Sequence, residues 1–201
     1  MFVTRGARRL AWIAGSFLLI SIATRVGLAL FSGEHYTLFQ WVRFMVVGFI
    51  FDITVLPWFI LPWAVYEAVM PEFSEQHRLG RWESRWAAVW GTLFLVLFII
   101  TAVSEFTFWE EFGNRFDFIA VDYLVYTHEV IGNIRESYPV GWWIAIIVTI
   151  CLAISWFSWP RGRNAPRTTR LARWGRAAVT GLAIVLGVAV VDQGLAETAP
   201  N

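Results

Sequence analysis

Long apolar runs separated by short polar segments dominate this chain. Five of these runs are predicted to be helices, over residues 10–31, 38–70, 86–108, 140–159 and 177–191. The hydrocarbon core of a bilayer is about 30 Å thick and needs about 20 mostly apolar residues in a helix that crosses it. The pattern therefore predicts an all-α integral membrane protein with about five transmembrane helices.

The first two runs each need an interpretation of their own. Arg5, Arg8 and Arg9 precede the first run, as basic residues precede a signal peptide. That run is about 22 residues long, which exceeds the usual 7–15 of a signal core, so we expect a retained helix. Pro57 and Pro62 lie inside the second run. Each lacks a backbone donor, so we expect this helix to be kinked or tilted there.

The composition supports lipid as the solvent. Hydrophobic residues make up 58% of the 201 residues and charged residues 15%. Soluble domains are typically about 45–50% apolar and about 25% charged. The chain has too little polar surface to cover a soluble core of this size. No basic face interleaves with aromatic residues in a soluble segment, so nucleic acid is not an expected partner.

The sixteen basic residues are all arginine, and most lie on one side of the predicted helices. The residues on that side are Arg5, Arg8, Arg9, Arg78, Arg81, Arg85, Arg161, Arg163, Arg167, Arg170, Arg173 and Arg176. The opposite segments contain Arg115 and Arg135, and Arg25 and Arg43 lie within predicted helices. The positive-inside rule then places the N-terminus in the cytoplasm, and five spans place the C-terminus outside.

No motif for catalysis or metal binding is evident. The chain has no Gly-rich phosphate loop, no HExxH, no CxxC and no Gly-x-Ser-x-Gly. His35, His77 and His128 are predicted on different sides of the membrane, so they are not expected to share a metal. Cys151 lies inside an apolar run, where a small buried side chain is the simplest interpretation. We expect neither a catalytic residue nor a cofactor in this chain.

Four charged residues fall within or near the predicted spans: Arg25, Arg43, Asp52 and Glu105. A charge near the bilayer centre costs about 2.5–3.5 kcal/mol on the insertion scale, so such residues usually pair or serve a function. One hypothesis is a polar pocket in the outer leaflet, where arginine binds the phosphate of an anionic phospholipid. The alternative is that Arg25 pairs with Asp52 for helix packing, while Arg43 and Glu105 extend to the interface.

The segment 115–138 has the pattern of an external amphipathic helix. Arg115, Asp122, Glu129 and Glu136 recur every seven residues, which places them along one face. Such a helix lies at the outer interface with its apolar face toward the lipid. It is either a structural helix on the membrane surface or a docking face for a substrate or another domain.

The same region carries a family resemblance. Residues 111–140 read EFGNRFDFIAVDYLVYTHEVIGNIRESYPV, and the most specific part is residues 116–139. This stretch resembles the segment before the fourth helix in the bacterial lipoteichoic acid synthase–like, phosphoglycerol transferase and sulfatase group. The five-helix layout is similar as well, so the resemblance covers the membrane half of that family.

The resemblance implies an extracytoplasmic domain of alkaline-phosphatase type after the fifth helix. That domain would carry a divalent metal and a Thr or Ser nucleophile, and none of these residues can be assigned to a position in this chain. By resemblance, the chain is expected to be a fragment or a truncated module that anchors the domain in the bacterial cytoplasmic membrane. Its expected partners are membrane lipids and that missing extracytoplasmic domain.

Two other classes of function stay open. A stand-alone scaffold or accessory subunit would bind a partner through the external helix. A small transporter would usually show repeated halves and several broken helices around a midplane site. Here the second run alone contains internal prolines, and no repeat is visible.

Overall fold

The computed structural model describes residues 4–33, 35–70, 78–112, 139–160 and 168–198. Within these ranges the chain forms five α-helices: α1 (Arg5–Phe31), α2 (Leu38–Val69), α3 (Arg78–Phe112), α6 (Val140–Ser158) and α7 (Arg170–Thr198). All five are long and apolar enough to cross a membrane. The predicted all-helical class with five apolar helices is confirmed. The amphipathic helix expected over 115–138 lies outside the described residues.

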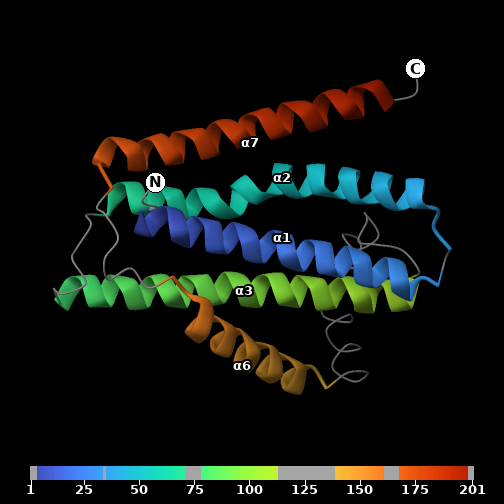
Figure 1. The fold of residues 1–201 in the computed structure, drawn as a ribbon, viewed down its shortest axis with the longest axis horizontal. Coiled ribbons are helices and arrows are strands. Elements are labelled where there is room, and N and C mark those ends of the chain that lie inside the picture. Colours follow the sequence, from blue (N-terminus) through green and yellow to red (C-terminus); the bar gives the residue numbers. More distant parts are fainter. Residues whose placement is uncertain (1–3, 34, 71–77, 113–138, 161–167, 199–201) are drawn as a thin grey trace, which may run out of the picture.

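The helices pack side by side in the order α7, α2, α1, α3, α6, each against the next (Figure 1). In Figure 1, α1, α3 and α7 run in one direction and α2 and α6 return in the other. The starts of α1, α3 and α7 therefore lie at the same end of the bundle as the ends of α2 and α6. We call this the arginine-rich end, because it carries Arg5, Arg8, Arg9, Arg78, Arg81, Arg85, Arg170, Arg173 and Arg176.

Local sequence explains where three of the helices begin. The hydroxyl of Thr4 accepts from the backbone N–H of Ala7 at the start of α1. Thr37 and Gln40 form a capping box at the start of α2, and Thr169 accepts from an N–H in the first turn of α7. These bonds satisfy backbone donors that a helix cannot pair within itself.

Three helices begin earlier than the apolar pattern indicated. We expected starts near residues 10, 86 and 177, whereas α1 begins at Arg5, α3 at Arg78 and α7 at Arg170. Each extra segment is rich in arginine, so a hydropathy pattern excludes it from the span. A helix pairs its own backbone groups wherever it lies, so it can continue into the headgroup region, where arginine is tolerated.

The prolines of α2 lie within a continuous helix. Pro57 and Pro62 are both inside the 32 residues of α2. Each breaks one backbone hydrogen bond and crowds the preceding turn, which offsets the helix axis. Figure 1 shows such an offset near the middle of α2, in agreement with the predicted kink.

The larger cluster of buried residues is mostly aromatic and lies toward the arginine-rich end. Its members are Ile13, Trp63, Ala87, Phe98 and Trp159, which come from α1, α2 and α3 and from the end of α6. The ring of Trp159 contacts that of Trp63 edge-on, with centroids 6.4 Å apart. Trp159 also lies against Gly91 of α3, where a side chain would occupy the same space. Because glycine has no side chain, the ring of Trp159 can pack against Gly91 and place the end of α6 on α3.

The outward surface is apolar. Large hydrophobic side chains point away from the bundle on every helix, including Phe51, which is 58% exposed, and Val185, which is 64% exposed. Soluble monomers rarely expose contiguous apolar surface beyond a few hundred Å². This surface therefore matches an acyl-chain environment, in which outward apolar residues carry no penalty.

We expect Gly91→Ala to weaken the attachment of α6. The added methyl group would overlap the ring of Trp159, and overpacking typically costs about 1–3 kcal/mol. The measurement is the thermal midpoint of the detergent-solubilised protein, which should fall.

Gly181→Ala on α7 is the matched control. An added Cβ there meets nothing within 4 Å, so this variant should gain the ordinary helix preference of alanine over glycine. Equal midpoints for the two variants would contradict the packing of Trp159 on Gly91.

Candidate functional site

A buried ion pair joins α1 to α2 inside the apolar part of the bundle. Arg25 Nη2 donates to Asp52 Oδ2 at 2.9 Å, and both side chains are buried. Ser21, one turn before Arg25, donates to Asp52 Oδ1 at 2.6 Å and accepts from Arg25 Nη2 at 3.3 Å. Two helices thus share one compact polar group.

The glycine at position 48 makes room for this pair. The guanidinium of Arg25 lies against Gly48, one turn before Asp52 on α2, and any Cβ there would overlap it. Within the described part of the chain, Arg25 Nε and Nη1 have no hydrogen-bond partner. The pair is therefore incompletely satisfied, which lowers its net contribution to stability.

Of the four charged residues singled out from the sequence, the structure brings Arg25 and Asp52 together. Arg43 is exposed on α2, about 14 Å of helix from Asp52, and Glu105 is half-buried on α3. This geometry favours the packing interpretation of Arg25 and Asp52. The head-group pocket of all four residues stays a prediction.

The second polar group lies at the arginine-rich end and links α1 to α3. Arg9 is 2% exposed, and its guanidinium meets Glu83 in a fork, with Nη1–Oε1 at 2.6 Å and Nη2–Oε2 at 3.4 Å. Arg5 lies 3.8 Å from the same carboxylate. A two-pronged arginine–carboxylate contact fixes the relative orientation of the two helices as well as their distance.

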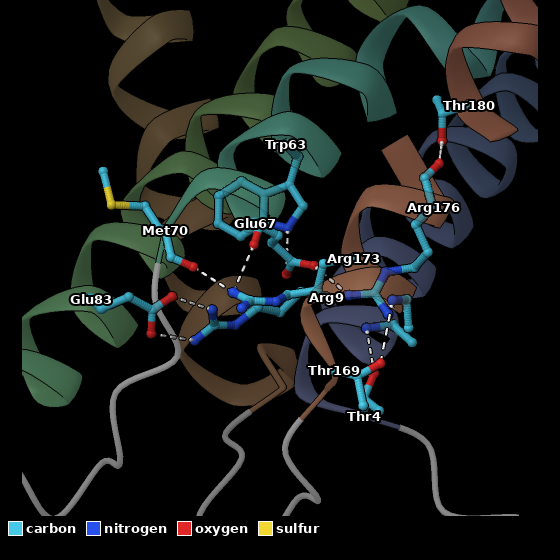
Figure 2. Close-up of polar contacts among 12 residues, drawn as sticks. Thr4, Arg9, Trp63, Glu67, Met70, Glu83, Thr169, Arg173, Arg176 and Thr180 are labelled. Carbon is cyan, nitrogen blue, oxygen red and sulfur yellow. Dashed lines mark hydrogen bonds and ion pairs between the residues drawn. The ribbon is translucent and has the colours of Figure 1, made fainter. Parts of the chain in front are cut away.

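The same end links α2 to α7 through Glu67 (Figure 2). Glu67 Oε2 accepts from Arg176 Nη2 at 3.3 Å, and its Oε1 accepts from the indole N–H of Trp63 at 3.0 Å. The carboxylate also lies against Gly6, so a side chain at position 6 of α1 would displace it. Glu67 is therefore packed where α1, α2 and α7 meet.

Arg173 caps the end of α2 from α7. Its Nη1 donates to the backbone carbonyls of Glu67 and Met70, the former at 3.1 Å. The last carbonyls of a helix have no partner within it, and a cation there also matches the negative end of the helix dipole. Figure 2 shows Arg9, Arg173, Glu67 and Glu83 close together at this end.

The chemistry of both groups is pairing and positioning. Among the described residues, no three His, Cys, Asp or Glu side chains lie close enough together to hold a metal ion. The predicted docking residues Arg115, Asp122, Glu129 and Glu136 lie outside the described residues.

No family model, curated protein or solved structure matches the chain.

Sequence reasoning treated the arginines as a topology signal and did not single out Glu67 or Glu83. A usable signal was present, because both are acidic residues on the arginine-rich side of the predicted spans. Their partners, however, are 74 residues away for Arg9–Glu83 and 109 residues away for Arg176–Glu67. Ion pairs between residues this far apart cannot be predicted from the pattern of a single sequence.

We expect Arg25→Met to destabilise the protein by about 3 kcal/mol, because it leaves the Asp52 carboxylate buried and unpaired. The double variant Arg25→Met/Asp52→Leu should recover most of this loss. The measurement is a double-mutant cycle on the free energy of unfolding in mixed detergent micelles.

Arg43→Met is the control for removing an arginine from these helices. Arg43 is exposed, so its loss should change the free energy of unfolding by less than about 0.5 kcal/mol. An Arg25→Met protein with unchanged stability but weaker binding of anionic lipid would instead support the head-group pocket.

We expect Glu83→Gln to destabilise the bundle more than Glu110→Gln does. Both residues lie on α3, but Glu83 neutralises the buried Arg9, whereas Glu110 is exposed. The cost at Glu83 should be about 2–3 kcal/mol, since part of that carboxylate reaches solvent. Thermal unfolding of both variants in detergent measures the difference, and equal shifts would contradict the role of Glu83.

Proposed function

We propose that this chain is a multi-pass domain of a bacterial cytoplasmic membrane that anchors an extracytoplasmic catalytic domain. The enzyme would be of the phosphoglycerol transferase or sulfatase-like kind and would act on lipid-linked head groups. The observation that carries the proposal is the separation of the two ends of the bundle. The arginines gather where α1 begins, and α7 ends at the opposite end (Figure 1).

The positive-inside rule turns this separation into an orientation. With the arginine-rich end in the cytoplasm, the N-terminus is inside and any polypeptide that follows α7 emerges outside. A domain tethered to α7 would then meet lipid head groups of the outer leaflet. The resemblance of residues 111–140 to the membrane half of the phosphoglycerol transferase and sulfatase group supports the same role.

The ion pairs at the arginine-rich end suit an anchor. Glu67 and Arg173 bind α7 to the end of α2, and α2 packs in turn on α1. α7 is therefore connected through α2 to the rest of the bundle. The described residues contribute the anchor, and the proposed chemistry belongs to the tethered domain.

Reporter fusions test the orientation. Alkaline phosphatase fused after Asn201 should be active in cells, and green fluorescent protein at the same position should be dark, because each reporter folds on one side of the membrane. Fluorescent protein at the N-terminus is the matched control and should be bright. The reverse pattern would overturn the proposed placement of the catalytic domain.

The native reading frame tests the enzymatic part. We expect codons beyond Asn201 to encode a domain with an exposed Thr or Ser among Asp, Glu and His metal ligands. A stop codon there, together with a partner that co-purifies in equal amount, would favour the accessory-subunit alternative instead.

A further inference from the structure

An open groove of about 510 Å³ runs along the bundle between α1, α2 and α7. Ala11 and Ala14 belong to its α1 wall, Gly175 and Val179 belong to its α7 wall, and Ile60 of α2 lies between them. Small residues, which are Ala11, Ala14, Ala172 and Gly175, leave space along both walls. At Gly175, an added Cβ would meet nothing within 4 Å.

The groove lies in the half of the bundle next to the arginine-rich end. Its α1 residues fall within the first three turns of that helix, and its α7 residues begin in the first turn. In a bilayer this depth is the acyl-chain region of the leaflet at that end. The volume falls within the range of about 300–1,000 Å³ that is typical of ligand sites.

The head of the groove is electropositive. The starts of α1 and α7 carry Arg5, Arg8, Arg9, Arg170, Arg173 and Arg176, and neither helix has an acidic residue in its first turn. Glu67 and Glu83 balance part of this charge. The positive ends of two helix dipoles add to the same field.

Arg176 connects the charge to the apolar groove. It is a lining residue, and its side chain remains 24% exposed. A guanidinium has five N–H donors, and the contact with Glu67 engages Nη2. The guanidinium of Arg176 therefore lies beside the apolar groove. This arrangement matches a phosphate attached to an acyl chain.

We propose that this groove holds one acyl chain of an anionic phospholipid from the leaflet at the arginine-rich end, with its phosphate bound by Arg176. The lipid would fill the space between α1 and α7 and complete the packing of α7 on the bundle. This site is separate from Arg25 and Asp52. The proposal also does not depend on the catalytic domain proposed above. It rests on the depth of the groove in the bilayer and on the positive charge at its head.

The test compares lipid retention by native mass spectrometry of the full chain in mild detergent, with added dioleoyl phosphatidylglycerol or dioleoyl phosphatidylcholine. The unmodified protein should bind the anionic lipid more tightly by roughly fivefold, because both lipids carry a phosphate but the choline cation of phosphatidylcholine opposes its contact with arginine. Gly175→Leu fills the groove without touching an ion pair, and it should remove that preference.

Gly181→Leu is the matched control on the same helix, at a glycine that does not line the groove and has open space around it. It should retain the anionic lipid as the unmodified protein does. Arg176→Gln should reduce the preference for the anionic lipid while zwitterionic lipid is still retained. Equal retention of both lipids by the unmodified protein, or unchanged retention after Gly175→Leu, would overturn the proposal.

Discussion

A charge can remain inside an apolar bundle when an opposite charge lies beside it, and the described residues show this constraint at three places. Arg9 meets Glu83, Arg25 meets Asp52, and Glu67 meets Arg176. Lipid supplies no solvent for an unpaired charge, so removing one partner costs far more than removing both. Each pair joins two different helices, and the pairs therefore specify which helices are neighbours where apolar packing alone is permissive.

The pairs are unevenly placed, and the proposed function follows from that unevenness. Two of the three lie at the arginine-rich end, where Arg173 also caps α2 and Trp159 docks on Gly91. These polar links between helices are therefore concentrated at that end. The proposed tethered domain would follow the opposite end, where α7 finishes. The groove lies beside α7 at the arginine-rich end, where the proposed lipid would add to the attachment of α7.

The number and type of elements followed from the sequence because their cause is local. An apolar run of about 20 residues is a property of consecutive positions, and so is an N-cap such as Thr37 with Gln40. The early starts of α1, α3 and α7 do not follow from hydropathy, because arginine lowers hydropathy without preventing a helix. The sequence offers the pairing of Arg25 with Asp52 as one of two alternatives, because both residues interrupt apolar runs.

The remaining contacts depend on three-dimensional arrangement. Glu67 and Glu83 form ion pairs with arginines on other helices. Gly91 is important for packing because the ring of Trp159 lies against it. Trp159 is the last residue of the predicted run 140–159, but its burial, at 5% exposure, depends on the space that Gly91 leaves. The apolar periodicity of one segment does not predict which residue of a distant segment it will contact.

The central claim is that the outward apolar faces of the helices contact the hydrocarbon of a bilayer. The most direct test measures whether these faces are exposed to lipid or to water. Nitroxide labels would be placed one at a time at Phe51, Leu152 and Val185, exposed apolar positions on α2, α6 and α7, in a Cys151→Ala background. Collision rates with oxygen, which concentrates in hydrocarbon, and with a water-soluble nickel complex report the surroundings of each label. The account predicts high oxygen and low nickel accessibility at all three. High nickel accessibility at these positions would show that the faces meet water and would contradict it.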